Sequence, residues 1–441
     1  MPQPARLAIG SVQPSANRFP VLWGLLDLWR RHGVQVQPFR SHAELASSPG
    51  AEVATGRPYR HIDCGMMFPR LNGHLLQYGS RGCDVAVVDG IFAPRRHEAG
   101  DNPFYLDALC DWLDLAGVVV IDVSQIRNGH LPDRPEHVDA VILDAVDSPQ
   151  QAARWEIEVE SLWRAPVVGW LDHAAPLRTV AEGLSADARP SPKLCRALGD
   201  ALARHLDEDL LLGLAHRQRI VPSGDPLFHL GVERGARVAV GIDEAMSRHF
   251  PENLDLISAR GAGLRDFSPL RAPELPRDAE VVYLGDGCLH AYAPKLAANY
   301  CLLVSLRSHV ASGGRIYAEG MGAALLGQEL IYPDGNRLPM AGVLPWSYRL
   351  VESPVPAALH TLGLEGDNWL IHGCGRLRGY AGCTQLELVE DIRNASVSPQ
   401  SNACLRAWGG AVASTLPLFF PAHPRLVTNL VRPAMALCGA K

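Results

Sequence analysis

The 441-residue sequence lacks the features that mark several classes of protein. Its ten cysteines are scattered, and no two form the C-x-x-C pair of zinc ribbons and thioredoxin-like proteins. No apolar run approaches the roughly 20 residues that a bilayer-spanning helix needs, and the opening residues MPQPARLAIGS contain no apolar core of a secretory signal. We therefore expect a cytoplasmic protein with reduced thiols and no membrane span.

An excess of positive charge is also absent. Lys and Arg number 41 and Asp and Glu number 47, which gives a formal net charge of −6. This balance excludes a strongly basic nucleic-acid binder, so no nucleic-acid partner is expected. Hydrophobic residues make up 47% and charged residues 20% of the chain, proportions typical of globular proteins. At about 150 residues per domain, the length predicts two or three domains.

What the first half does contain is an alternation of short apolar runs and longer amphipathic stretches. Residues 21–32 carry Leu22, Leu25, Leu26 and Trp29 at helical spacing. Repeated strand–helix–strand units predict a parallel sheet with right-handed crossovers. The runs predicted as buried strands are residues 7–10, 34–39, 85–89, 117–122, 140–144 and 167–171.

This rhythm breaks in a polar segment rich in Pro and Gly, residues 216–236 (HRQRIVPSGDPLFHLGVERGA), which is typical of a linker. A second series of strand-initiated units then begins, with apolar runs at 238–242, 281–285 and 315–319. The sequence thus predicts an α/β protein with domains at 1–215 and 237–441.

The first candidate site is the turn after the first strand, where a phosphate-binding loop would lie. Residues 11–19 read SVQPSANRF, so Pro, Ser and Ala stand at the glycine positions and Asn17 or Arg18 at the lysine position. The groups that bind the β- and γ-phosphates and Mg²⁺ are missing, which favours a structural turn. Arg18 still offers an anion contact, and Asp89 at a strand end still offers a carboxylate to Mg²⁺.

Several segments resemble the cobyrinic acid a,c-diamide synthase family. They are residues 36–40 (VQPFR), 55–63 (TGRPYRHID), 84–92 (DVAVVDGIF), 251–254 (PENL), 267–270 (FSPL), 296–299 (LAAN) and 343–345 (VLP). The resemblance implies a P-loop-like, dethiobiotin-synthetase-like domain followed by a flavodoxin-like class I glutamine amidotransferase-like domain.

The same resemblance locates a second candidate site, at which the catalytic groups are replaced. The family's Y-A-E-C-G-G turn, which exposes a nucleophilic cysteine, is matched by residues 317–322 (YAEGMG), so that Gly320 stands at the cysteine position. Pro417 and Phe419 stand at the histidine positions. A glycine cannot form a thioester, so no catalytic residue is expected here. Cys288 and His290 form the one alternative Cys/His pair nearby, but neighbours two residues apart rarely aim side chains together.

Arginines supply the candidate binding groups. Arg40, Arg57 and Arg60 lie in the matching segments, and guanidinium groups bind carboxylates bidentately, as a carboxylate-rich tetrapyrrole would require. The alternative is that they are surface ion-pair partners. No cofactor or metal site is expected, apart from residual ATP and Mg²⁺ at Arg18 and Asp89 or a bound tetrapyrrole.

Because both sites are altered, the sequence favours a non-catalytic relative that binds a tetrapyrrole or pairs with an active paralogue as a homo- or hetero-oligomer. The alternative is an ATP-dependent ligase that amidates side-chain carboxylates of a corrin or sirohaem-like ring. A pure assembly subunit is a third hypothesis.

Overall fold

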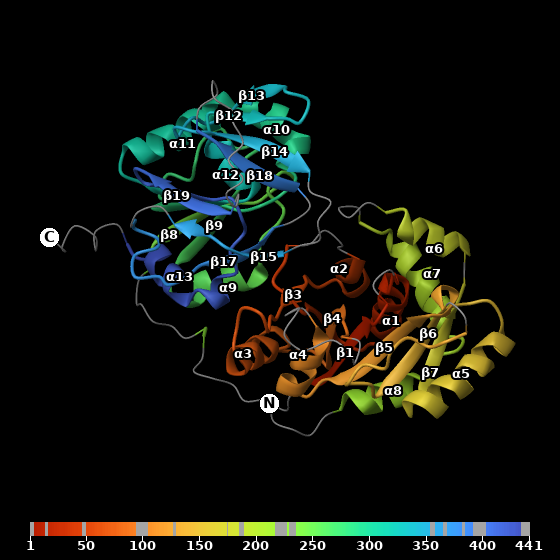
Figure 1. The fold of residues 1–441 in the computed structure, drawn as a ribbon. Coiled ribbons are helices and arrows are strands. Elements are labelled where there is room, and N and C mark those ends of the chain that lie inside the picture. The colour runs from red at the N-terminus through yellow and green to blue at the C-terminus, as the bar shows by residue number, and fades with distance from the viewer. Residues whose placement is uncertain are drawn as a thin grey trace. The chain divides into compact units, whose positions relative to one another are not determined.

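The protein is described by a computed structural model that divides into two compact units, Met1–Pro226 and Leu227–Lys441 (Figure 1). The predicted linker, residues 216–236, falls mainly outside the described residues and stays a prediction. The structure describes residues 4–13, 16–45, 50–93, 105–126, 129–173, 175–184, 189–216, 227–228, 235–352, 358–364, 368–381, 384–390 and 403–433.

The first unit is built on a seven-stranded sheet of order β3-β2-β4-β1-β5-β6-β7, in which every neighbouring pair is parallel. Five of the six predicted strand runs fall within strands of this sheet, and the sixth, residues 34–39, begins two residues before β2. The predicted parallel α/β architecture is confirmed. The two-residue strand β3 was not predicted. The strands are β1 (Ala5–Ser11), β2 (Val36–Arg40), β3 (Arg60–His61), β4 (Val85–Ile91), β5 (Ala116–Asp122), β6 (Ala140–Val146) and β7 (Val167–Asp172).

Helices flank this sheet (Figure 1). The predicted helix is α1, and Leu22, Leu25, Leu26 and Trp29 are all 1% exposed or less. The helices are α1 (Phe19–Arg31), α2 (Gly50–Thr55), α3 (Pro69–Gly79), α4 (Leu106–Leu113), α5 (Pro149–Trp163), α6 (Ala175–Glu182), α7 (Pro192–Leu202) and α8 (Glu208–Ala215).

The second unit has a seven-stranded sheet of order β16-β19-β20-β11-β10-β8-β9, whose five strands from β20 to β9 run parallel. The smaller sheets β13-β12-β14-β18 and β15-β17 complete it. The strands are β8 (Arg237–Gly241), β9 (Gly263–Phe267), β10 (Val281–Leu284), β11 (Arg315–Glu319), β12 (Glu329–Ile331), β13 (Arg337–Pro339), β14 (Ser347–Glu352), β15 (Ala358–Thr361), β16 (Gly363–Leu364), β17 (Arg378–Ala381), β18 (Thr384–Val389), β19 (Cys404–Trp408) and β20 (Ala411–Ser414). The helices are α9 (Pro251–Ala259), α10 (Leu289–Ala298), α11 (Tyr300–Ala311), α12 (Met321–Leu326) and α13 (Pro424–Leu430).

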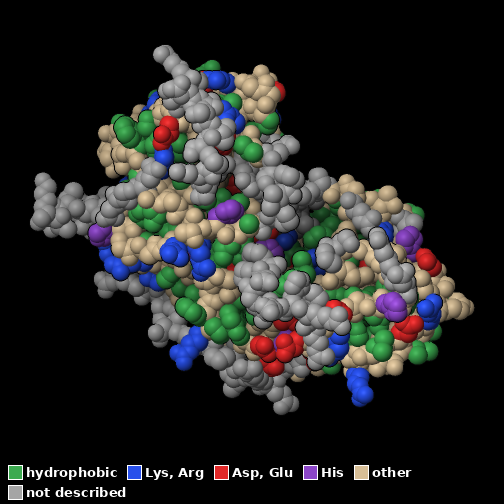
Figure 2. All heavy atoms as spheres, viewed as in Figure 1, with side chains coloured by type: hydrophobic (Ala, Val, Ile, Leu, Met, Phe, Trp, Pro, Cys, Tyr) green, Lys and Arg blue, Asp and Glu red, His purple; other side chains and the backbone are tan. Residues whose placement is uncertain are grey.

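Both signs of charge are interspersed with apolar side chains on the face seen in Figure 2, in keeping with the small net charge. Among the helices in the described ranges, none is long and apolar enough to cross a membrane.

The packing of α1 against α7 depends on two glycines. A Cβ atom on Gly24 would lie 3.0 Å from the backbone carbonyl of Leu198, and one on Gly199 would lie 3.1 Å from the carbonyl oxygen of Gly24. Such distances are tighter than ordinary van der Waals contact, so the absence of side chains lets the two helix backbones approach closely.

We expect Gly24→Ala to lower the free energy of unfolding by about 1–2 kcal/mol, because overpacking outweighs the gain in helix propensity. Gly213→Ala is the matched control, since Gly213 lies inside α8 with open space at its Cβ position. There the same change should stabilise the protein by about 0.5–1 kcal/mol. Urea unfolding of both variants checks this. Equal effects of the same sign would contradict the close-packing role of Gly24.

Candidate functional site

The first candidate site lies at the carboxyl ends of the central strands of the first unit. Parallel pairing places Asp89 of β4 beside Ile9 of β1 on one side and beside Arg40 of β2 on the other. This edge is where open α/β sheets bind their ligands. The structure therefore brings together three of the residues that the sequence singled out, namely Arg18, Arg40 and Asp89.

Arg18 and Asp89 neutralise each other. The Arg18 Nε donates to Asp89 Oδ1 at 2.5 Å, and the side chains of Arg18 and Asp89 are 15% and 2% exposed. The second carboxylate oxygen, Oδ2, is buried without a hydrogen-bond partner. A phosphate would need this guanidinium and a Mg²⁺ ion would need this carboxylate, so the ion pair occupies both groups with each other.

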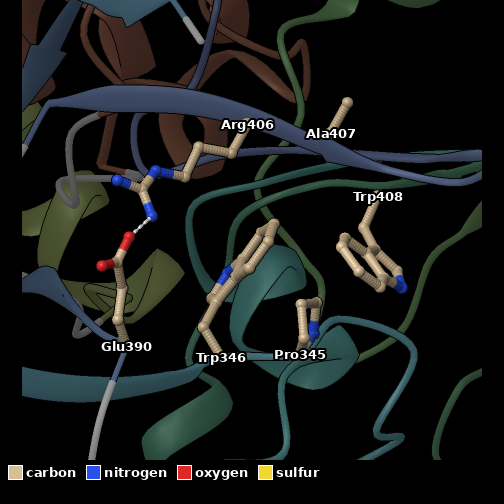
Figure 3. A pocket seen from close by; sticks show the side chains of 6 residues that line it. All are labelled: Pro345, Trp346, Glu390, Arg406, Ala407 and Trp408. Atoms are coloured by element: carbon tan, nitrogen blue, oxygen red, sulfur yellow. Dashed lines mark hydrogen bonds and ion pairs between the residues drawn. The ribbon is translucent and has the colours of Figure 1, made fainter. Parts of the chain in front are cut away.

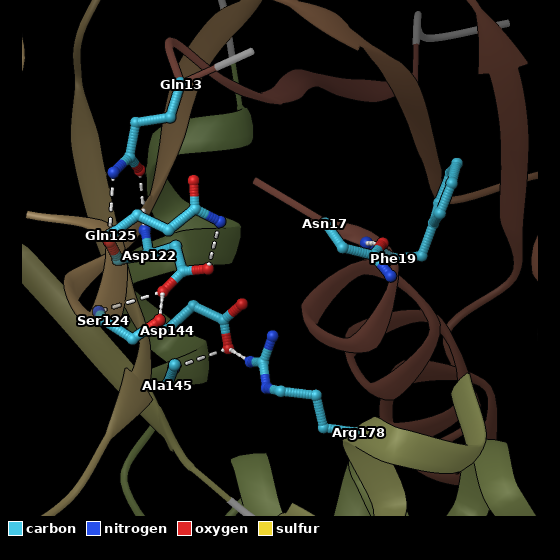
Figure 4. A network of polar contacts seen from close by, with 9 residues as sticks. All are labelled: Gln13, Asn17, Phe19, Asp122, Ser124, Gln125, Asp144, Ala145 and Arg178. Atoms are coloured by element: carbon cyan, nitrogen blue, oxygen red, sulfur yellow. Dashed lines mark hydrogen bonds and ion pairs between the residues drawn. The ribbon is translucent and has the colours of Figure 1, made fainter. Parts of the chain in front are cut away.

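The described residues around the start of α1 make hydrogen bonds within the chain. Asn17 Oδ1 accepts a hydrogen bond from the Phe19 amide at 3.1 Å, and Pro20 has no amide hydrogen to donate. The Gln13 side chain binds both the amide and the carbonyl of Asp122 on β5, at 2.8 and 3.0 Å (Figure 4). A P-loop presents free helix-terminal amides and a lysine to the phosphates. Gln13, Asn17 and Pro20 therefore do not fit the way in which a P-loop binds a nucleoside triphosphate with Mg²⁺.

Arg40 lies in a region with two histidines and Glu44. Its guanidinium lies 4.6 Å from the centre of the Tyr59 ring. Burial raises the pKa of Glu44, but the hydrogen bond from His42 and the charges of His42, Arg40 and His61 hold that pKa below its usual value. Arg40, His42 and His61 therefore act on one small region beside Glu44.

The other two predicted arginines belong elsewhere. Arg60 pairs with Phe39 across β2 and β3, whereas Arg40 pairs with His61. The Arg60 guanidinium lies 5.8 Å from the centre of the Tyr78 ring. Arg57 and Arg60 both act electrostatically on the Cys83 thiol. Arg57 and Arg60 thus influence Cys83, whereas Arg40 influences Glu44.

Sequence reasoning missed a second buried ion pair at this edge. Arg178 of α6 pairs with Asp144 of β6, which also accepts from the Ala145 amide at 2.8 Å (Figure 4). Burial raises the pKa of Asp144 to about 7, although Arg178 opposes that shift. The signal for this pair was an aspartate at the end of a predicted buried strand, the same signal that identified Asp89.

The second candidate site is the turn between β11 and α12, where Gly320 has φ 53° and ψ −129°. The turn predicted from the resemblance is present with its left-handed φ, which glycine adopts without strain. A Cβ atom at Gly320 would lie only 2.4 Å from Asp286 Oδ1. That oxygen accepts the Met321 amide at 2.8 Å. The Asp286 carboxylate therefore occupies the space that a side chain at position 320 would need.

Glu319, immediately before Gly320, fixes the turn through buried hydrogen bonds. It is fully buried and accepts hydrogen bonds from the Tyr283 hydroxyl at 2.5 Å, the Tyr317 hydroxyl at 2.6 Å and the Leu418 amide at 3.0 Å. Burial raises its pKa to about 7 against the opposing effect of these donors. Sequence analysis assigned no role to this residue.

The residues at the expected histidine positions belong to an apolar core. Phe419 is fully buried and packs edge-on against Phe250, with ring centroids 5.1 Å apart. Pro417 is half-buried, and its carbonyl lies near Gly379. Neither side chain carries a group that can transfer a proton.

The alternative Cys/His pair stays untested, because the side chain of His290 lies outside the described residues. The Cys288 sulfur lies 3.6 Å from Arg248 Nη2, and Arg248 Nη1 lies 3.9 Å from Asp286 Oδ2. Among the residues that the structure describes, no three His, Cys, Asp or Glu side chains are arranged to hold a metal ion.

We expect Gly320→Cys to destabilise the protein by at least about 2 kcal/mol, because the new Cβ atom meets Asp286 and the left-handed φ disfavours a side chain. Adding Asp286→Gly removes the obstructing carboxylate. The double variant should therefore recover at least about 1 kcal/mol relative to the sum of the single changes. A double-mutant cycle by urea unfolding measures this coupling. Strict additivity would contradict the steric conflict between positions 286 and 320.

We expect the free energy of unfolding to fall as pH rises from about 4.5 to about 7, because native Glu319 holds a proton that the unfolded chain releases. Glu319→Gln removes this contribution, so the wild type should lose about 3 kcal/mol more than the variant between pH 4.5 and pH 8. Asp144 contributes in the same direction in both proteins and cancels in the comparison. Identical pH profiles for wild type and variant would show that Glu319 titrates normally.

Comparisons with known proteins match most of this chain. A model of the CobB/CobQ-like glutamine amidotransferase domain matches residues 237–355. The hydrogenobyrinate a,c-diamide synthase of Streptomyces coelicolor is 29% identical over 392 residues, which are 78% of this chain and 79% of the relative. The cobyrinate a,c-diamide synthase of Syntrophotalea carbinolica is 26% identical over 83% of this chain and 82% of its own length.

Another relative spans nearly the whole chain. The cobyrinate a,c-diamide synthase of Dehalococcoides mccartyi strain CBDB1 is 24% identical over 98% of this chain and 99% of its own length. These matches include both units, and the domain model falls on the predicted second domain. The chain is therefore similar over most of its length to the cobyrinic acid a,c-diamide synthases, as its sequence motifs predicted.

Proposed function

We propose that this chain is a relative of the a,c-diamide synthases that binds a carboxylate-rich tetrapyrrole without hydrolysing glutamine. The observation that carries this proposal is the Gly320 turn, where the carboxylate of Asp286 fills the place of a nucleophilic side chain and accepts the Met321 amide. A thioester needs a thiol at this turn and an amide free to stabilise the developing oxyanion. Both requirements fail together.

The first unit supports the same proposal. The Arg18–Asp89 ion pair and the Asn17 contact use the groups that a phosphate or its metal would require. Activation of a carboxylate by ATP depends on positioned cations around the phosphates. An edge whose charges already neutralise each other is suited to structural integrity more than to phosphoryl transfer.

Recognition of the ligand rests on Arg40. Its guanidinium lies 4.6 Å from the centre of the Tyr59 ring, and Arg40, His42 and His61 all act on Glu44. The relatives are named for cobyrinate and hydrogenobyrinate, which are polycarboxylated rings. Such a protein would bind the tetrapyrrole as a homo-oligomer or as a hetero-oligomer with an active paralogue.

A second candidate is ATP-dependent amidation of ring carboxylates with ammonia supplied from elsewhere. The names of the relatives favour this candidate over the first, since each is named as a synthase. The unpartnered Asp89 Oδ2 also offers one carboxylate oxygen to a metal ion. The two candidates differ in whether the chain binds Mg-ATP and alters the ring, and both place it in the cytoplasm.

We expect the full-length protein to bind cobyrinic acid, and Arg40→Gln to weaken binding by at least about tenfold through loss of a charged contact. Arg154→Gln is the control, because Arg154 is 64% exposed on α5. Visible absorbance titration and calorimetry give the affinities, and circular dichroism verifies that each variant is folded. Equal affinities for wild type and Arg40→Gln would remove Arg40 from the site, and absence of binding would remove the tetrapyrrole proposal.

The same samples separate the two candidates. With glutamine, the first candidate predicts no ammonia release, and with Mg-ATP, it predicts no thermal shift and no release of phosphate. Incubation of cobyrinic acid with Mg-ATP and ammonium, followed by mass spectrometry of the ring, tests amidation directly. An amidated product would establish the second candidate and overturn the first.

A further inference from the structure

A cavity of about 410 Å³ lies in the second unit. The ends of three strands form it, and none of its lining residues belongs to the Gly320 turn. Its lining consists of Pro345, Trp346, Glu390, Arg406, Ala407 and Trp408 (Figure 3). This volume falls in the usual range for small-molecule sites, which is roughly 300–1,000 Å³.

The backbone holds the two tryptophans in fixed positions. Trp346 precedes β14, and its indole Nε1 donates to the Tyr348 hydroxyl at 2.9 Å, which leaves the ring to make contacts through its carbon surface. Trp408 ends β19 opposite Ala411, and the intervening turn contains Gly409 at φ 57°. A two-glycine hairpin turn of this kind is short and well defined.

The two indoles differ in exposure. Trp346 is 7% exposed and Trp408 is 57% exposed, and in Figure 3 they lie on either side of Pro345. Indole rings stack on planar aromatic ligands and contribute much of the energy at such sites. The exposed Trp408 ring, at the rim of the cavity, can therefore stack on a flat ligand.

The polar part of the cavity is an internal ion pair. Arg406 pairs with Glu390, and its guanidinium lies 6.0 Å from the centre of the Trp346 ring. The Glu390 side chain is 65% exposed and the Arg406 side chain 20%. Because the Glu390 side chain is mostly exposed, solvent weakens its attraction to Arg406. A ligand anion can therefore take the place of the glutamate carboxylate on the guanidinium.

We propose that this cavity binds a heteroaromatic ring that carries an anionic group, of the size and chemistry of a nucleoside monophosphate. The ring contacts the indoles, and the anion replaces Glu390 on Arg406. The aromatic surfaces alone would accept any flat molecule, whereas the guanidinium selects one that bears a carboxylate or phosphate. The lining residues of this site belong neither to the Arg40 group nor to the Gly320 turn.

Fluorine NMR of the full chain labelled with 5-fluorotryptophan provides a local readout, because the chain has nine tryptophans and Trp408→Phe identifies one resonance. The probes are AMP, adenosine and inorganic phosphate. We expect AMP to shift the Trp408 resonance saturably, adenosine to bind about tenfold more weakly, and phosphate to leave the resonance unmoved. No shift with millimolar AMP, equal affinity for adenosine, or an equal response to phosphate would each overturn the proposal.

Variants test each contact separately. Trp408→Ala should weaken AMP about tenfold by loss of stacking, and Arg406→Gln should abolish the preference for AMP over adenosine. For Trp408→Ala, where the readout is lost, calorimetry measures the affinity. Glu390→Gln should strengthen AMP binding at least about twofold, because the competing carboxylate is gone. An unchanged or weakened affinity in Glu390→Gln would contradict displacement of the glutamate.

Two exposed residues of the same unit serve as controls. Tyr300 on α11 is 70% exposed, and Arg271 is 62% exposed in an ion pair with Glu244. Tyr300→Ala and Arg271→Gln remove an aromatic ring and a guanidinium outside the cavity lining, so AMP affinity should not change. Loss of affinity in these controls would show that AMP binds elsewhere on the unit.

Discussion

The central constraint on both units is that a carboxylate buried at the end of a parallel strand must have a partner. Removing an ionised carboxylate from water costs several kcal/mol unless hydrogen bonds or an opposite charge compensate. Parallel sheets concentrate the ends of their strands at one edge, which carries Asp89 and Asp144 in the first unit and Glu319 in the second. Their partners are Arg18, Arg178 and a pair of tyrosine hydroxyls. Every one of these partners comes from the chain itself.

Both candidate sites share this feature: polar groups that could meet a ligand contact other groups of the chain. An enzyme leaves charges and amides at a strand edge free to meet a substrate, and it tolerates the cost in stability. Here Arg18 contacts Asp89 where a phosphate would lie, and Asp286 contacts the Met321 amide where an oxyanion would form. The two sites lie in different units and use different chemistry, yet each replaces a ligand interaction with an intramolecular one. Both contacts support the proposed binding role without glutamine hydrolysis. The synthase names of the relatives remain the opposing argument.

Much of the framework followed from the sequence, since buried parallel strands are continuous apolar runs and the α1 stripe repeats at helical spacing. The tight turn at Gly320 followed from the resemblance. The contact between Gly320 and Asp286 did not, because it depends on the register of two parallel strands: Leu284 lies opposite Ala318, so the residues two positions later also lie side by side. The contacts of Arg40, Arg57 and Arg60 likewise did not follow from the sequence, because β3 has only two residues and shows no period. Long-range side-chain partners are therefore the part of the site that the sequence does not reveal.

The register also couples the residues at positions 286 and 320 sterically. With glycine at 320, an aspartate at 286 gains a hydrogen bond from the Met321 amide and fills a space that would otherwise be empty. With a cysteine at 320, the same aspartate would meet the new Cβ atom and place a negative charge beside a thiol that must ionise to react. Each residue is thus compatible with only one state of the other. The steric and electrostatic effects of Asp286 on a cysteine at position 320 would therefore act in the same direction.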